Sequence, residues 1–213
     1  MSFRFYKLIG NGLQFNVYRI DENRVFKKPT TRSQKISLLK KWGVKNSTAA
    51  HKQMLEAEKN ADRSLHKLKK IIKNINPKII GNPIFLKHLN YTQDIALPLG
   101  SYFTQHSFKE NKVTLNANIE NIFQTWRFGF SDKVFNFTIN NGVRNGRVIL
   151  LDLGELSFSK KEIERLIDNK IWLNQWSYLY IKNIKLKKYF ATLMNSRITT
   201  TALKKTGESI CVN

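Results

Sequence analysis

The chain has 213 residues, of which 41% are hydrophobic and 12% aromatic, so it can build a folded core and is not disordered as a whole. Its 37 basic and 15 acidic side chains give a formal net charge of +22, and residues 1–80 hold 19 of the basic and 5 of the acidic ones. This charge favours anionic partners, which could be nucleic acid, an acidic protein or another anionic substrate, but it does not determine the fold.

Cysteine, histidine and apolar runs exclude several further classes. Cys211 is the single cysteine and cannot form an intramolecular disulfide, and the four histidines are too scattered for a zinc site. No run approaches the ~18 apolar residues that a membrane span requires, and the first residues lack the apolar core of a secretory signal. These features predict a cytoplasmic protein with no membrane span, and secretion as an effector without a readable signal stays open.

The first 30 residues predict three short strands, over 3–10, 15–20 and 24–29, separated by the turns GNG and DEN. The glycines of the first turn would let the backbone approach a phosphate, although an ordinary tight hairpin uses the same residues. On the third strand Lys27 shares a face with Val25, and Lys28 faces the other way. A shift of one residue in register exchanges the two lysines, so either could face a site.

A polar, basic segment over 30–50 predicts a mobile connection, and a long helix follows it. Apolar residues recur at helical spacing from Met54 to Ile75, and Pro77 marks the end of the helix. Glu58 lies on this apolar stripe, where a carboxylate needs a partner because an unpaired one destabilises the fold.

The second half of the chain predicts a strand after Pro83, a connector near Leu97 and a helix over 115–128. A hairpin is expected from strands at 135–139 and 147–154, followed by helices over 159–181, capped by Ser159, and 186–198. We therefore predict an α+β protein with a β-rich lobe (residues 1–98) and a reduced, mostly helical lobe (99–213). The tail over 199–213 is expected to be weakly ordered.

The segment GRVILLDLGEL contains the most informative carboxylate. Asp152 follows a buried-looking strand, and Gly154 permits a turn that would aim its carboxylate into a cleft. A buried carboxylate requires a charged partner, and a divalent metal ion is a natural one. Upstream, Asp132 could accept a proton, and the Asn136 side chain could supply a second oxygen to the metal.

The order of these features resembles the protein kinase-like fold. GNGLQFNVY is similar to the glycine-rich loop, with Phe15 in place of the third glycine, and VFK is similar to the lysine strand. Glu58 matches the helix glutamate of that fold, and Asp-Leu-Gly over 152–154 resembles its Asp-Phe-Gly motif. The resemblance covers roughly residues 5–175, and it is closest to minimal kinase-like proteins of bacteria and phages.

This resemblance implies an ATP- and Mg²⁺-dependent phosphotransferase that acts on a protein or a small-molecule hydroxyl. It implies that Lys27, oriented by Glu58, holds phosphates, that Asp132 orients the acceptor, and that Asn136 and Asp152 hold Mg²⁺. The same resemblance gives the nucleotide contacts as Gly10, Gly12, Val17, Lys27 and Leu97.

The chain also departs from the family pattern. Asp132 is preceded by Gly-Phe-Ser instead of His-Arg, and Asn136 follows it by four residues rather than five. Only about six residues separate Asp152 from the next helix. These departures leave two alternatives open: a pseudokinase that serves as an interaction module, and a basic nucleic-acid-binding protein suggested by segments such as LKKW.

Overall fold

The computed structural model describes residues 6–179 and 181–208 of the chain. These residues form two compact units, each with its own interior. Unit 1 consists of residues 1–70 and 82–95, and unit 2 of residues 71–81 and 96–213. The last change of unit lies between residues 95 and 96, and the segment 71–81 belongs to unit 2 although unit 1 surrounds it in the sequence.

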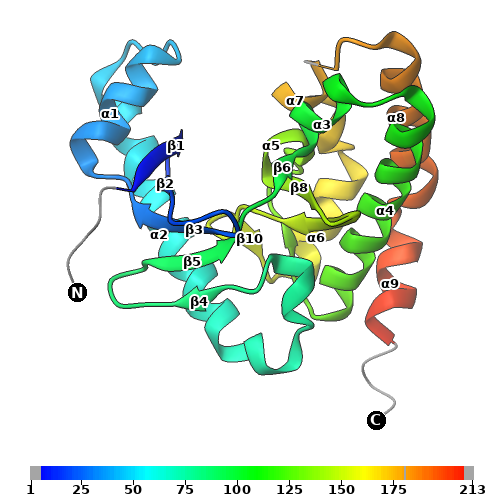
Figure 1. The fold of residues 1–213 in the computed structure, drawn as a ribbon, viewed down its shortest axis with the longest axis horizontal. Coiled ribbons are helices and arrows are strands. Elements are labelled where there is room, and N and C mark those ends of the chain that lie inside the picture. Colours follow the sequence, from blue (N-terminus) through cyan, green and yellow to red (C-terminus); the bar gives the residue numbers. More distant parts are fainter. Residues whose placement is uncertain (1–5, 180, 209–213) are drawn as a thin grey trace. The chain divides into compact units, whose positions relative to one another are not determined.

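Unit 1 is built on a five-stranded antiparallel sheet with the strand order β1-β2-β3-β5-β4 (Figure 1). Its strands are β1 (Lys7–Asn11), β2 (Phe15–Arg19), β3 (Arg24–Pro29), β4 (Ile84–Phe85) and β5 (Tyr91–Asp94). Two helices complete the unit, α1 (Arg32–Lys41) and the long α2 (Ser47–Ile71). The three expected strands and the long helix are all present, because their apolar patterns match the strand and helix periods.

The segment expected to be a mobile connection is helix α1 instead. Thr31 caps it by accepting a hydrogen bond from the Gln34 N–H, and the Gln34 side chain in turn accepts one from the Thr31 N–H. Leu39 is buried and packs with Ala50 and Met54 of α2. Capping and this small apolar contact are therefore enough to order a helix in a largely basic segment.

Unit 2 is mostly helical and begins with two 3₁₀ turns, η1 (Ile72–Asn74) and η2 (Pro77–Ile80). Its α-helices are α3 (Leu99–Gln105), α4 (Phe108–Arg127), α5 (Phe137–Asn140), α6 (Lys160–Asp168), α7 (Trp176–Leu179), α8 (Ile184–Arg197) and α9 (Thr200–Glu208), and a third 3₁₀ turn is η3 (Ile171–Leu173). Its strands are β6 (Leu97–Pro98), β7 (Ser131–Asp132), β8 (Asn141–Arg144), β9 (Arg147–Leu150) and β10 (Leu156–Ser157). The α+β class, with a β-rich first part and a mostly helical second part, is confirmed.

Two expectations for unit 2 were wrong. Residues 137–139 of the expected strand lie in the short helix α5, and the hairpin strand begins only at Asn141. The tail expected to be weakly ordered contains helix α9 over 200–208, where Leu203 is buried in the core of the unit; residues 209–213 lie outside the described part. In both places tertiary packing overrides a weak local pattern.

The β8–β9 hairpin provides a test of local backbone strain. Asn145 and Gly146 link the strands with positive φ angles of 49° and 73°, as a type I′ turn requires. Because a Cβ added to Gly146 would meet nothing within 4 Å, the cost of Gly146→Ala comes from the backbone alone. We expect Gly146→Ala to destabilise the protein by about 1–2 kcal/mol in urea unfolding. Asn145→Gly, the control, should change the unfolding midpoint little, since glycine adopts the same angle freely.

Candidate functional site

The glycine turn of unit 1 is fixed by hydrogen bonds to the segment that follows β3. The Gly12 N–H donates to the Phe15 carbonyl at 2.9 Å, and the Thr30 hydroxyl donates to the Gly12 carbonyl at 2.8 Å. Gly10 lies inside β1 opposite Val17, and a Cβ there would come within 3.4 Å of the Val17 Cβ. Glycine at position 10 therefore allows the two strands to pack closely around Val17.

Lys27 lies on the buried face of the sheet. It is 7% exposed and Val25 is 4% exposed, whereas Lys28 is exposed to solvent. Its neighbours across the sheet are Val17 on β2 and Tyr91 on β5, and its Nζ lies 5.5 Å from the centre of the Tyr91 ring. Of the two lysines, Lys27 is thus the one that shares a face with Val17.

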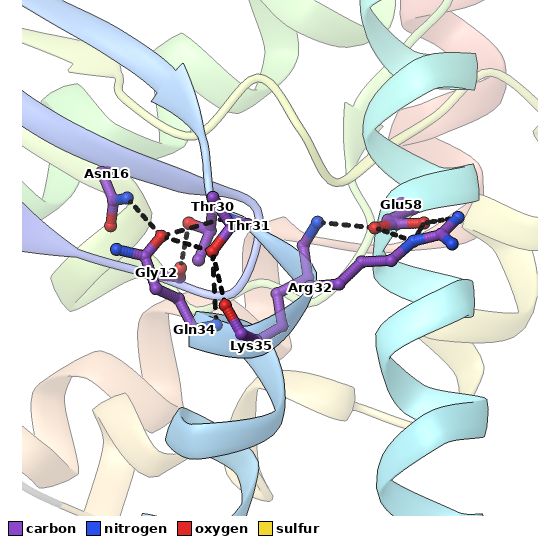
Figure 2. Close-up of polar contacts among 9 residues, drawn as sticks. Gly12, Asn16, Thr30, Thr31, Arg32, Gln34, Lys35 and Glu58 are labelled. Atoms are coloured by element: carbon purple, nitrogen blue, oxygen red, sulfur yellow. Dashed lines mark hydrogen bonds and ion pairs between the residues drawn. The ribbon is translucent and has the colours of Figure 1, made fainter.

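Glu58 pairs with two cations of α1 instead of with Lys27 (Figure 2). Lys35 Nζ lies 3.1 Å from Glu58 Oε1, and Arg32 Nη2 lies 3.1 Å from Oε2. Burial acts to raise the pKa of Glu58, but the hydrogen bonds and charges of Arg32 and Lys35 outweigh it and lower that pKa below its usual value. The sequence indicated that this carboxylate needs a partner, and the structure provides Arg32 and Lys35 of α1, a helix that was not expected to form. The pairing with Lys27 that the resemblance implies stays a prediction.

In unit 2, Asp132 lies at the end of β7, opposite Leu156 of β10. Its carboxylate accepts hydrogen bonds from the Val134 N–H at 3.0 Å and from Asn140 Nδ2 at 3.1 Å. Burial raises the pKa of Asp132 to about 7, and the charge of Asp152 adds to this effect, while the two hydrogen bonds oppose it. Asp132 is therefore a buried carboxyl group that exchanges its proton near neutral pH.

Asp152 follows β9 after a single residue, and the Gly154 N–H donates to its Oδ1 at 2.8 Å. This is the local turn that the Asp-Leu-Gly sequence suggested. The Asn140 carbonyl accepts hydrogen bonds from the backbone N–H groups of Leu151, at 2.6 Å, and Asp152, at 3.3 Å. Asn140 thus contacts Asp132 through its side chain and Asp152 through its backbone.

Sequence reasoning missed Asn140 and selected Asn136. Asn136 directly precedes α5, and its Oδ1 is buried without a hydrogen-bond partner among the described residues. Asn140 lies one helical turn later, and its N–H donates to the Asn136 carbonyl at 2.8 Å. The spacing Asn-x-x-x-Asn places both amides on the same side of a helix. A helical prediction for this segment would therefore have selected Asn140 together with Asn136.

Leu97 is in β6 and pairs with Val143 of β8. Its carbonyl oxygen would lie only 2.9 Å from a Cβ on Gly142, so a glycine at that position is needed for β6 to approach β8. The structure therefore fixes the backbone of Leu97 within unit 2.

The acidic and amide oxygens of unit 2 are compatible with a hard cation. Asp132 and Asp152 repel one another, and a divalent ion held by carboxylate oxygens would relieve this repulsion. Asn136 Oδ1 is a further oxygen that is buried without a donor among the described residues. Within residues 6–179 and 181–208, no group of three or more His, Cys, Asp or Glu side chains is arranged to hold a metal. In the same residues, no helix is both long enough and apolar enough to cross a membrane.

Comparisons with known proteins found a likeness in structure but none in sequence. No protein-family model matches the chain, and no curated protein matches it significantly. One similar structure is the ADP-bound aminoglycoside phosphotransferase APH(2'')-Ib, with 9% identity and a TM-score of 0.41 over 98% of this chain and 92% of that chain. Another is the gentamicin–APH(2'')-IIa complex, with 10% identity and a TM-score of 0.38 over 97% and 90% of the two chains. The likeness is thus loose, and the proposals below rest on the residues of this chain.

Proposed function

We propose that the protein is a phosphotransferase that uses ATP with Mg²⁺ and transfers the γ-phosphate to a hydroxyl group. The observation that carries this proposal is the pair of interacting carboxyl groups in unit 2, Asp132 and Asp152, which Asn140 contacts through its side chain and its backbone. Phosphoryl transfer requires this combination of a cation site and a group that accepts a proton near neutral pH. The order of sequence motifs supports the same chemistry.

The residues of unit 1 are assigned to the phosphates of ATP. Lys27 is the proposed cation for the phosphate oxygens, and the backbone of Gly10 and Gly12 covers them. Val17, which lies opposite Lys27 on the same face of the sheet, is proposed to contact the base or sugar. In this proposal Glu58 orients Lys27 when the nucleotide binds, and in the structure it pairs with Arg32 and Lys35.

The residues of unit 2 are assigned to the chemical step. Asp132 accepts the proton of the acceptor hydroxyl while that oxygen bonds to the γ-phosphorus and the bond from phosphorus to the bridging oxygen of ADP breaks. Asn140 orients the Asp132 carboxylate through its 3.1 Å hydrogen bond. Asp152 and Asn136 would hold Mg²⁺, which when bound neutralises charge on the phosphate oxygens. Leu97 is proposed as a further contact for the nucleotide.

A thermal-shift titration tests the nucleotide site. At ATP concentrations near 100 times its dissociation constant, the wild type should gain about 2.7 kcal/mol in the presence of Mg²⁺. Asp152→Ala should lose the Mg²⁺-dependent part of this gain, and Lys27→Met should weaken it with or without Mg²⁺. Lys28→Met is the matched control, because Lys28 is the exposed neighbour on the same strand and should behave as the wild type. A wild type that shows no shift with ATP contradicts the proposal.

The two alternatives give different results in the same preparation. A pseudokinase would bind ATP without consuming it or transferring phosphate. A nucleic-acid-binding protein would bind RNA with an affinity that falls steeply as salt rises. The second alternative is favoured by the 55% exposed Trp42, which lies beside the exposed Lys40, Lys41 and Lys45. The same charge would also suit a phosphotransferase whose acceptor is an acidic protein or another anionic substrate.

A further inference from the structure

A pocket of about 390 Å³ lies within unit 1, apart from Lys27 and Val17. Its wall includes the start of β2, the segment from β3 into α1, and one face of α2, and Figure 2 shows several of the polar side chains on this wall. Pockets of this size hold small organic molecules. The chemistry of its wall therefore indicates what kind of molecule fits.

Several hydrogen-bond donors of the pocket wall are not fully used. Gln14 is 7% exposed, and its Nε2 is buried without a hydrogen-bond partner among the described residues. Arg32 contacts Glu58 through Nε and Nη2 and not through Nη1. The ammonium group of Lys35 donates one hydrogen bond to Glu58. A buried amide donor without an acceptor is costly, so a ligand that supplies an acceptor is favoured at this position.

The wall also holds two carboxylates, Glu58 and Asp62, whose charges match those of its two cations. Both oxygens of Glu58 already accept from Arg32 and Lys35, and Asp62 is exposed to solvent. The remaining wall has an apolar part that includes Phe15, Pro29 and Leu89. The site thus combines unused donors and two cations with an apolar surface.

We propose that this pocket binds a small phosphate monoester that carries an apolar group. The three terminal oxygens of the ester would accept hydrogen bonds from Gln14, Arg32 and Lys35, and its apolar group would cover Phe15 and Leu89. Arg32 is suited to this exchange because its side chain is 70% exposed and can leave Glu58, whereas the 5% exposed Lys35 remains in place. Lys35 then donates hydrogen bonds to both Glu58 and the ester.

Isothermal titration calorimetry with phenyl phosphate tests this site. The wild type should bind phenyl phosphate more tightly than it binds inorganic phosphate or phenol, because each of these offers only one half of the ligand. Gln14→Leu and Lys35→Met should each weaken the binding of phenyl phosphate at least tenfold, since each removes a donor to the phosphate. Lys41→Met is the control for charge, because Lys41 is an exposed lysine of the same helix.

A further variant and a competition experiment keep the result interpretable. Arg32→Met alters an exposed side chain and should also weaken binding, so it replaces Lys35→Met if loss of the buried lysine prevents folding. Protein saturated with ATP and Mg²⁺ should bind phenyl phosphate as the free protein does, and competition between the two compounds would place phenyl phosphate at the nucleotide site. Binding that is absent in the wild type, or equal in the Gln14→Leu, Arg32→Met and Lys35→Met variants, overturns the proposal. Neither of these calorimetric results changes the thermal shift expected with ATP, so the pocket proposal can fail while the proposed function holds.

Discussion

Replacement of Asp132 by Asn should remove most of the loss of stability that Asp132 causes between pH 4 and pH 8, although the amide can accept only one of the two hydrogen bonds that the carboxylate accepts. The pKa of Asp132 is raised from 3.8 to about 7, chiefly by burial, so the carboxyl group takes up a proton on folding between these values. The stability associated with this proton is fully present below pH 3.8 and is lost as the pH rises through about 7. A difference of about three units corresponds to roughly 4 kcal/mol, which is the upper limit for this loss.

Urea unfolding of both proteins across this pH range, in buffer containing EDTA, measures the effect. Other groups of this protein, whose net charge is +22, also change their charge over this pH range. Their effect on the free energy of unfolding cancels in the difference between wild type and variant. Glu56→Gln is the control, because Glu56 is an exposed acid on α2 and its replacement should give no such trend. If Asp132→Asn and the wild type lose stability in parallel from pH 4 to 8, Asp132 is not a buried group with a raised pKa.

The same substitution should lower the rate of the proposed phosphate transfer. An amide cannot accept the proton of the acceptor hydroxyl, so the rate of transfer should fall by about 10²–10⁴-fold. A variant that is more stable and less active would fit a site where two carboxyl groups are held together at the expense of stability. A more stable variant that retains its full rate would assign Asp132 a structural role only.

The sequence was sufficient for those elements whose apolar pattern is strong. Helix α2 was predicted from its stripe of residues, and five of these, Met54, Ala61, Leu65, Leu68 and Ile75, are buried, although Ile75 lies just past the helix. The strand that carries Lys27 was predicted from its short apolar run. Its alternation placed Val25 and Lys27 on one face without deciding which face is buried, and the structure buries that one. In these cases the apolar residues on one face of the element are enough to predict its type, without knowledge of the rest of the chain.

Contacts that depend on a weak element could not be predicted. The Lys35–Glu58 ion pair exists only because α1 forms, and that helix has few apolar residues to reveal it. One signal was present, since Thr31 and Gln34 have the spacing of a capping box. For α5, the β-branched and aromatic residues favoured a strand, but packing selects a helical turn that places Asn140 against Asp132.

Replacement of Phe190 by Ala should destabilise unit 2 by about 3–5 kcal/mol and loosen the support of Asn140. Phe190 of α8 is fully buried and stacks on Phe137 of α5, with ring centres 4.0 Å apart. Because α5 has only four residues, its helical turn depends on this contact more than on its own hydrogen bonds. Loss of the ring should therefore weaken the hydrogen bond between the Asn140 N–H and the Asn136 carbonyl.

Urea unfolding gives the overall cost, and hydrogen exchange of the Asn140 amide gives the local one. The matched control is Ile184→Ala on the same helix, where the side chain is 69% exposed and its loss should cost little. Faster exchange at Asn140 in Phe190→Ala, beyond that expected from the global loss of stability, would show that α8 supports the group that orients Asp132. Exchange that follows global unfolding alone would mean that α5 is held by its neighbours without Phe190, and that the aromatic stack contributes only to the core.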